Sequence, residues 1–540
     1  STYHRLMLFV LIAAAAAGGG AAAVLLILVL VVYLRSRGVQ WIDSIGIHFL
    51  TSKRYGSTSV VQSLLTFKNK VTYESFVKKW GSIISYYPIF THSVKKRRFL
   101  WSYFDEKTEF DISNHVFCVE EPLTMEEITR YCQQQVLEPL SDQLPLWRVL
   151  IFTNLQGSEE ASSILLLRYH KCLADGFSML QLLLTESQHI AEPSVADDES
   201  IALQSQDPPS PEEVPRLGSK EEAYLDLSVP PEGDYSLNPV VYNPTPHAQC
   251  GFKSTYMGSY WSMVGTRKDG ESPLRSKKIV DAPQSRFLGL RILDVSIDDL
   301  ANLSHFDMTI NDVILGSIYH SIQYFLHPRF QQMGTKRLHS FLWVSRNPDR
   351  FLFSPLMERE KVQLSNRDVS ALVMDVPLQL ESPWDCAMNV HHQLWLRSND
   401  QEVRVAQRWM KWWGWMPRFW GDRRFAQFMR RGSFSVTMIP GPKSSTSLNG
   451  NPITSIVTAE APVGNEEMHV SVMCYNNKIS LSIIANSTIL TQEDIQSLLA
   501  KCNENMTDIV TRITKQEPFS CREEAVITVC QDDSLGESTV

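Results

Sequence analysis

Three side chains that could carry acid or base chemistry lie within six residues of one another: His170, Lys171 and Asp175. They follow a continuous apolar run, Ile164 to Leu167. An apolar run that gives way abruptly to polar residues is typical of a buried strand, and the Asp175–Gly176 pair predicts a turn out of that strand. Polar groups placed there suit acyl transfer, in which the attacking hydroxyl must lose a proton.

The element that follows the turn is predicted from its spacing. Apolar side chains recur at Phe177, Leu180 and Leu184, in steps of three and four, which indicates a helix with one face on a core. The strand, turn and helix together would deliver the polar side chains to a loop in the interior of the protein.

The string His170-Lys171-x-x-x-Asp175-Gly176 resembles a known motif. The family of bacterial and plant wax ester synthase/acyl-CoA:diacylglycerol acyltransferases carries His-His-x-x-x-Asp-Gly at such a strand end. The first histidine, the aspartate and the glycine match, whereas Lys171 replaces the second histidine. In that family the second histidine is the catalytic base, so the difference falls on the position that matters most for the reaction.

Further segments resemble the same family, in the same order along the chain: Phe110–Val116, Leu144–Val149, Asn311–Val313, Val376–Leu378 and Ser435–Pro442. In the last of these, Pro440, Gly441 and Pro442 match the family's Pro-Gly-Pro, while Met438 replaces an asparagine. Two prolines around a glycine predict a tight loop, which suits a crossover segment between domains. Gly176, Pro440, Gly441 and Pro442 are therefore expected to have structural roles.

The resemblance covers about residues 41 to 514. It implies an α/β fold in which two chloramphenicol-acetyltransferase-like domains face each other around a central tunnel that holds the histidine motif. Five regions are expected: a transmembrane anchor (6–34), an N-terminal acyltransferase domain (41–190), an acidic, proline-rich linker with a partly ordered connector (191–285), a C-terminal acyltransferase domain (286–514) and a disordered tail (515–540). Apolar periodicity predicts strands at 61–67, 287–295 and 338–345, and helices at 72–84 and 309–325.

The stretch from Leu6 to Leu34 is apolar throughout and carries no charge. At 1.5 Å per residue it can cross a hydrocarbon core of roughly 30 Å, which predicts a retained transmembrane helix. Arg5 precedes it, whereas Arg35 and Arg37 follow it, so the positive-inside rule places the body of the protein in the cytosol. The expected location is the endoplasmic reticulum membrane, crossed once.

The overall composition excludes several classes of protein. A net charge of −8 with 20% charged residues gives no indication of a nucleic-acid partner. The nine cysteines form no C-x-x-C pair, which argues against a zinc site and a disulfide framework and favours a reducing compartment. His391 and His392 are neighbours in a predicted helix and point about 100° apart, so they cannot share a metal. No metal and no cofactor are expected beyond acyl-CoA as a co-substrate.

The segment from Arg408 to Trp420 is unusually rich in tryptophan and also carries cationic side chains. That combination is typical of a membrane interface or of the mouth of an apolar channel. A helix buried between domains would explain it equally well, and the sequence leaves both interpretations open.

The reaction that the resemblance implies is transfer of a fatty acyl group from acyl-CoA to diacylglycerol or a long-chain alcohol, giving triacylglycerol or wax ester. A base with a pKa near 7 suits this chemistry. Histidine qualifies unaltered, whereas a lysine does so only where burial lowers its pKa by about three units. Three alternatives remain: Lys171 is such a base, His170 takes over if the loop turns it inward, or the chain keeps only the lipid-binding tunnel.

The resemblance also gives Asp175 a role. In the family the aspartate orients the motif loop through a buried ion pair and does not react. Lys171, four residues earlier, is the candidate partner in this chain. Such a pair favours the alternative function, a catalytically impaired relative that binds lipid or regulates.

Overall fold

The computed structural model describes residues 40–51, 58–95, 102–106, 110–157, 161–184, 269, 274, 286–306, 308–328, 338–345, 362, 364–366, 368–379, 382–398, 402–416, 418–463 and 466–515. The predicted transmembrane segment (6–34) lies outside these residues, as do the tail after residue 515 and the linker (191–285) except for Asp269 and Leu274. No helix within the described ranges has both the length and the apolar character that crossing a bilayer requires.

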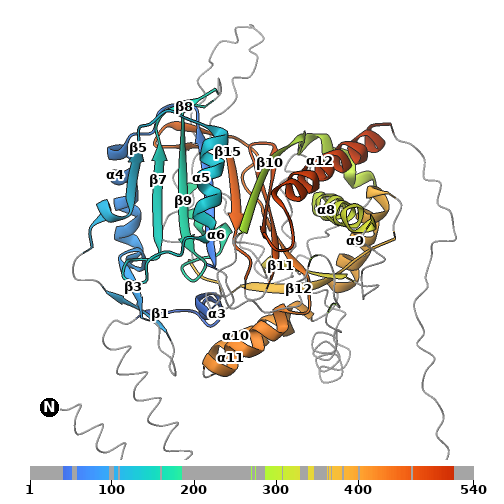
Figure 1. The fold of residues 1–540 in the computed structure, drawn as a ribbon, viewed down its shortest axis with the longest axis horizontal. Helices are drawn as coiled ribbons and strands as arrows, with labels where there is room; N and C mark the ends of the chain where they lie inside the picture. The colour runs from blue at the N-terminus through green and yellow to red at the C-terminus, as the bar shows by residue number, and fades with distance from the viewer. Residues whose placement is uncertain are drawn as a thin grey trace, which may run out of the picture.

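Two six-stranded sheets form the framework of the protein (Figure 1). In spatial order, the first sheet consists of β14 (Ser447–Leu448), β15 (Asn451–Glu460), β2 (Val60–Phe67), β9 (Ser163–His170), β7 (Trp147–Phe152) and β5 (Val116–Val119). The second sheet consists of β10 (Arg286–Ser296), β17 (Lys478–Asn486), β16 (Met468–Tyr475), β13 (Phe434–Ile439), β11 (Leu338–Ser345) and β12 (Val369–Val376). Both mix parallel and antiparallel pairs, and the three strands predicted from periodicity are β2, β10 and β11.

Helices cover the two sheets. Those with the first sheet are α4 (Tyr73–Tyr86), α5 (Met125–Leu137) and α6 (Gly176–Leu184), and those with the second are α8 (Ile310–Leu326), α9 (Pro383–Ser398), α10 (Glu402–Trp415), α11 (Arg418–Met429) and α12 (Gln492–Lys515). A short helix, α3 (Gly46–Thr51), lies beside α10 and α11 (Figure 1). The remaining elements are β1 (Gln40–Trp41), β3 (His92–Lys95), β4 (Tyr103–Glu106), β6 (Leu123–Thr124), β8 (Leu155–Gln156) and the 3₁₀ turns Pro88–Phe90, Ile112–Asn114 and Asp298–Phe306.

The helices predicted at 72–84 and 309–325 begin where their sequences provide a cap. Thr72 accepts a hydrogen bond from the backbone of Ser75 at the start of α4. At the start of α8, Thr309 and Asp312 form a reciprocal capping box, which satisfies two backbone N–H groups that the helix itself leaves unpaired. These contacts explain why the apolar periodicity becomes helical at those points.

The second sheet separates two cores because side chains alternate along its strands. On β11, Leu342 and Val344 pack in the core that contains α8, α9 and α12. Phe341 and Trp343 point to the other face, where they join α3, α10 and α11. Both faces of this sheet are therefore buried, which fits the uninterrupted apolar run Phe341–Val344 within β11.

A crossover segment links the two sheets. The chain leaves β13 of the second sheet, passes through Pro440–Pro442 and enters β14 and β15, and β15 pairs antiparallel with β2 of the first sheet. The Pro-Gly-Pro segment thus forms the interdomain crossover that the sequence predicts. Gly441 permits a close approach, since a Cβ there would lie 2.3 Å from the carbonyl oxygen of Cys474 on β16.

Replacing Gly441 with alanine should therefore destabilise the protein. The methyl group would overlap the backbone of β16, and overpacking of this kind typically costs about 1–3 kcal/mol. Gly81→Ala on α4 is the matched control, because a Cβ there meets no atom within 4 Å. Thermal unfolding followed by circular dichroism should show a lower Tm for Gly441→Ala and an unchanged or higher Tm for Gly81→Ala. Equal melting temperatures for the two variants would contradict this account of the crossover.

Candidate active site

The motif loop has the predicted strand–turn–helix form. Strand β9 ends at His170, a tight turn follows, and α6 begins at Gly176. The backbone N–H of Lys171 donates to the carbonyl oxygen of Ser59 at 2.9 Å, and that of Leu173 donates to the carbonyl oxygen of His170 at 3.0 Å. The loop is therefore held in place by backbone hydrogen bonds before any of its side chains is considered.

His170 is buried in this turn and does not line the pocket described below. Its ring nitrogen Nδ1 accepts a hydrogen bond from the backbone N–H of Cys172 at 3.1 Å. The lone pair of Nδ1 is thus occupied in shaping the turn. The structure does not bring His170, one of the three predicted catalytic residues, to the pocket that Lys171 and Asp175 line.

Lys171 forms a buried ion pair with Glu460, at the end of β15. The distance from Lys171 Nζ to Glu460 Oε2 is 2.8 Å, and the two side chains are only 8% and 5% exposed. The ring of Phe49 on α3 lies 5.8 Å from the same ammonium nitrogen. The expectation that Lys171 pairs with Asp175 is wrong. Strand β15 comes from the C-terminal half but joins the first sheet beside β2, and this strand exchange brings the Glu460 carboxylate to the ammonium.

Asp175 instead contacts the first turn of α6. Its Oδ1 accepts hydrogen bonds from the backbone N–H of Ser178 at 2.7 Å and from the Ser178 hydroxyl at 2.9 Å. A carboxylate at this point is favoured by the positive end of the helix dipole. Asp175 therefore fixes where the helix begins, and through it the path of the motif loop.

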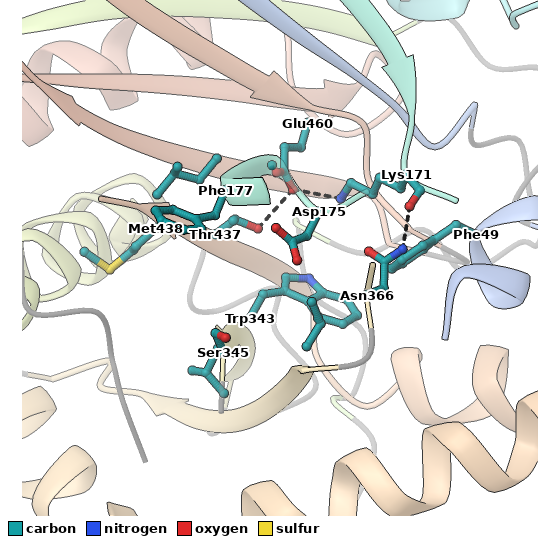
Figure 2. A pocket seen from close by; sticks show the side chains of 14 residues that line it. Phe49, Lys171, Asp175, Phe177, Trp343, Ser345, Asn366, Thr437, Met438 and Glu460 are labelled. Atoms are coloured by element: carbon teal, nitrogen blue, oxygen red, sulfur yellow. Dashed lines mark hydrogen bonds and ion pairs between the residues drawn. The ribbon is translucent and has the colours of Figure 1, made fainter. Parts of the chain in front are cut away.

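Lys171, Asp175 and Gly176 of the motif loop form one wall of a pocket between the two halves of the protein (Figure 2). The pocket has a cavity volume of about 80 Å³ and is partly open to solvent. Side chains from β11, β13, the end of β15 and α3 face those of the motif loop. The lining residues are Phe49, Lys171, Asp175, Gly176, Phe177, Trp343, Val344, Ser345, Asn366, Val369, Thr437, Met438, Ile439 and Glu460.

Of two further lining residues, Asn366 connects the C-terminal half to the motif loop and Trp343 offers a hydrogen-bond donor to the pocket. The side-chain amide of Asn366 donates to the backbone carbonyl of Lys171 at 2.8 Å, so the C-terminal half also holds the motif loop. Trp343 is buried on β11, and within the described residues its indole nitrogen Nε1 has no hydrogen-bond partner. An unpaired buried donor that lines a pocket is available to a ligand.

Gly176 is where the helix, the crossover and the ion pair come closest. A Cβ at this position would lie 2.8 Å from Glu460 Oε1 and 2.7 Å from Cδ1 of Ile439, the residue that precedes Pro440. A larger side chain would push directly against the ion pair. This geometry accounts for a glycine at the end of the motif.

Glu460 is held in its ionised form by its surroundings. Burial alone would raise its pKa, but the nearby Lys171 ammonium, together with His469, holds the pKa of Glu460 well below the usual range of a glutamate. Thr437 Oγ1 lies 3.1 Å from Glu460 Oε2, within hydrogen-bond distance, and His469 Nε2 lies 3.5 Å from the same oxygen. In the resulting pair Lys171 is an ammonium, which has donor hydrogens and no lone pair.

Glu460, Thr437, Asn366 and His469 are site residues that the sequence interpretation missed. Each lies in the C-terminal half, far along the chain from the histidine motif, and no local pattern marks any of them. The Pro-Gly-Pro crossover was the available signal, because the strands on either side of such a segment must pass close to the first sheet.

Family models match both halves of the chain. The model described as the wax ester synthase/diacylglycerol acyltransferase catalytic domain matches residues 87–221, and the one described as the WS/DGAT C-terminal domain matches residues 366–510. The chain belongs to the wax ester synthase/diacylglycerol acyltransferase family, as its motifs predict.

Relatives in plants and bacteria support the same assignment. "Wax ester synthase/diacylglycerol acyltransferase 9" of Arabidopsis thaliana is 22% identical over 428 residues, which cover 73% of this chain and 82% of that protein. "Probable diacyglycerol O-acyltransferase tgs1" of Mycobacterium tuberculosis is 22% identical over 442 residues, which cover 78% of this chain and 84% of that protein. At family level these names support acyl transfer to diacylglycerol or another alcohol.

Solved structures show the same fold. The wax ester synthase/diacylglycerol acyltransferase from Marinobacter aquaeolei VT8 matches with a TM-score of 0.50 and 11% identity, covering 87% of this chain and 100% of that one. The first condensation domain of the calcium-dependent antibiotic synthetase matches with a TM-score of 0.53 and 10% identity, covering 87% and 96%. The predicted chloramphenicol-acetyltransferase-like α/β fold is thereby confirmed.

Removing one member of the buried ion pair should be more harmful than removing both charges. Lys171→Met leaves the Glu460 carboxylate buried without its cation and should lower the free energy of unfolding by about 3 kcal/mol. The double variant Lys171→Met/Glu460→Gln has no uncompensated charge and should recover most of that loss. Urea unfolding of both variants measures the difference. A double variant no more stable than Lys171→Met would contradict this account, because the loss would then not come from an uncompensated charge on Glu460.

Proposed function

We propose that this protein is an O-acyltransferase that moves a fatty acyl group from acyl-CoA to diacylglycerol or a long-chain alcohol. The observation that carries the proposal is the pocket between the two halves, in which the motif loop presents Lys171, Asp175 and Gly176 to an otherwise largely apolar lining. An acyl chain fits such a lining, and the polar groups gather where a thioester would react. The family assignment supports this choice of reaction.

In this proposal Lys171 is a hydrogen-bond donor and not a base. Its ammonium is held by Glu460, so it has no lone pair with which to take a proton from the alcohol. The Trp343 indole N–H is a second donor on the C-terminal side of the pocket (Figure 2). Donors of this kind stabilise the negative charge that develops on the thioester oxygen as the alcohol attacks.

The alternative is a catalytically impaired relative that binds lipid or regulates. The Lys171–Glu460 pair favours it in one respect, because the pair occupies the position at which the family has its base. Such a protein would keep the apolar pocket and would hold acyl chains or acylglycerols without turnover.

Ester formation tests the two functions directly. Microsomes that carry the wild-type protein, given labelled acyl-CoA with diacylglycerol or a long-chain alcohol, should form labelled ester. Trp343→Phe removes one N–H and keeps most of the packing, so it should lower kcat by about a hundredfold if that donor holds the oxyanion. Trp384→Phe is the control, because Trp384 is buried in the other core of the second sheet.

Two results would count against an active acyltransferase. If the wild type forms no ester while acyl lipids co-purify with it, the lipid-binding function replaces the proposal. If the wild type is silent but Lys171→His forms ester, the pocket is intact and the chemistry alone has been lost.

We also propose that the protein works on a membrane surface, and α10 is the element that supports this. Its inner face packs Ala406, Met410 and Trp413 against the second sheet. On its outer face Trp412 and Trp415 are 51% and 63% exposed. Exposed tryptophan on an amphipathic helix is typical of insertion into the headgroup region of a bilayer. In this proposal the inner face of the segment is packed inside the protein, as in a buried helix, and its outer face contacts the membrane.

The exposed arginines on α10 and α11 and the chain segment that packs against α10 also suit a membrane surface. Arg408, Arg423 and Arg424 are exposed on α10 and α11 and suit anionic headgroups. Gly414 packs so closely that a Cβ there would lie 1.8 Å from the carbonyl oxygen of Ser44, near the start of the described chain. Five residues separate the apolar stretch 6–34 from Gln40, and the six steps from Leu34 to Gln40 span at most about 21 Å. The tryptophan face and a membrane-bound stretch can therefore reach one bilayer.

Fluorescence quenching checks this surface. In vesicles that contain brominated lipid, the tryptophan fluorescence of the full-length protein should be quenched. The double variant Trp412→Phe/Trp415→Phe should lose a large share of that quenching, because bromine quenches only side chains within the bilayer. Trp384→Phe, buried away from this face, serves as the control. Equal quenching of the two variants would exclude α10 as the membrane-facing element.

A further inference from the structure

A line of hydrogen-bonded side chains leads from the pocket into the protein. Thr437 on β13 lines the pocket, and its Oγ1 lies 3.1 Å from Nε2 of His469 on β16. His469 Nδ1 lies 2.5 Å from the Ser435 hydroxyl oxygen. That hydroxyl lies 2.7 Å from Oε2 of Glu466. The four side chains therefore form one unbroken chain of polar contacts.

The order of the chain follows from strand pairing. Strands β13 and β16 are parallel neighbours, and Ser435 is registered opposite His469. Ser435 and Thr437 are two residues apart on β13, so they point to the same face and both reach the imidazole ring. His469 is 0% exposed and Glu466 is 2% exposed, whereas Thr437 is only half-buried. Thr437 is thus the end of the chain that a substrate can reach.

His469 can accept a proton where Lys171 cannot. Burial lowers the pKa of His469 to about 4, so the ring is neutral at physiological pH and one of its nitrogens has a free lone pair. Its position behind Thr437 prevents direct contact with a substrate in the pocket. A proton from the pocket must therefore pass through the Thr437 hydroxyl.

Glu466 closes the inner end of the chain. Its Oε2 receives the Ser435 hydroxyl and the backbone N–H of Val463, whereas in the described part of the protein its Oε1 has no hydrogen-bond partner. Burial raises the pKa of Glu466 to about 7. A carboxylate that is buried and only half satisfied is suited to take up a proton near neutral pH.

The single hydrogen of each hydroxyl allows two consistent arrangements of this chain. With Glu466 ionised, Ser435 donates to Glu466, His469 Nδ1 donates to Ser435, and Thr437 donates to His469 Nε2. With Glu466 protonated, every one of these hydrogen bonds reverses, and Thr437 donates to Glu460 instead. The protonation of Glu466 and the tautomer of His469 are therefore linked.

We propose that Thr437, His469, Ser435 and Glu466 form a proton relay that takes the place of the missing motif histidine. This inference rests on the proposed acyltransferase function and deepens it. Thr437 is the residue that contacts the alcohol, and the other three act through it.

The step balances as follows. The alcohol oxygen bonds to the acyl carbon while its proton passes to Thr437 Oγ1, and the proton of Thr437 passes to His469 Nε2. The proton on His469 Nδ1 moves to Ser435, and that of Ser435 moves to Glu466. The carbon–sulfur bond breaks, and its electron pair leaves with the CoA sulfur. The proton then returns along the chain to the thiolate, which gives free CoA and restores ionised Glu466.

Within this network, Glu466 is the group whose pKa lies near 7, even with the charged groups around it taken into account. Burial lowers the pKa of Arg286 to about 10, and Glu467 beside it favours the charged form of that arginine. Arg286 and Lys171 both favour the ionised form of Glu466, although burial outweighs them. Glu460 stays ionised and His469 stays neutral through this range. Because the ionised form accepts the proton, kcat/KM should rise with pH through about 7.

The test is the pH profile of ester formation between about pH 5.5 and 9, with acyl-CoA and the alcohol that the wild type uses. Glu466→Gln keeps the shape but cannot ionise, and Ser435→Ala removes one link. Both should lower kcat about a hundredfold with the KM for acyl-CoA unchanged, and both should lose the rise near pH 7. Ser482→Ala is the matched control, because it removes an equally buried hydroxyl that donates to the Thr458 carbonyl outside the chain.

The outcomes separate the relay from the function it serves. If the wild type forms ester while Glu466→Gln and Ser435→Ala keep the rate and pH profile of Ser482→Ala, the relay is overturned and the acyltransferase stands. If the wild type forms no ester, both are overturned. Should Glu466→Gln fail to fold, Ser435→Ala decides alone, since it differs from its control only in which buried hydroxyl is lost.

Discussion

The ion pair between Lys171 and Glu460 is the interaction on which the arrangement of the two halves depends. Two charges this deeply buried are tolerable only while each neutralises the other. Lys171 comes from the turn after β9, and Glu460 comes from the end of a strand that follows the crossover. The first sheet must therefore include β15, in the register that it has, before the lysine finds its partner. Asn366 adds a second contact between the halves, because its side-chain amide donates a hydrogen bond to the backbone carbonyl of Lys171.

That pair also decides what chemistry the motif can perform. A lysine held as an ammonium supplies positive charge and hydrogen-bond donors, which are useful to a developing oxyanion. In the proposed reaction, it leaves open where the proton of the attacking alcohol goes. The only neutral imidazole next to Glu460 among the described residues is His469, and strand β13 places a hydroxyl between it and the pocket. In the proposed relay, the polar chain behind Thr437 supplies the proton acceptor that the replaced histidine would have been.

Much of the fold could be predicted from local patterns, whereas the site could be predicted only in part. The strand Leu338–Ser345 and the cap at Thr309 follow from periodicity and capping chemistry, because those signals act within a few residues. The partner of Lys171 could not be found in this way, because the nearest acid in sequence, Asp175, is used by α6 and the nearest in space arrives by strand exchange. In the tryptophan-rich segment, helical spacing distinguishes the buried Trp413 from the exposed Trp412, so one face packs inside the protein and the membrane interpretation stays a prediction for the other.

The strand exchange has a consequence for how the protein is made. Strand β2 is an inner strand of the first sheet only because β15 covers one of its edges. A ribosome releases β2 long before it releases β15, so during synthesis this apolar strand exposes a row of unpaired backbone groups. Such an edge can pair with other chains until its own partner emerges. Neither half can complete its final form as an independent unit, and a nascent chain of this protein has reason to need a chaperone until residue 460 has left the ribosome.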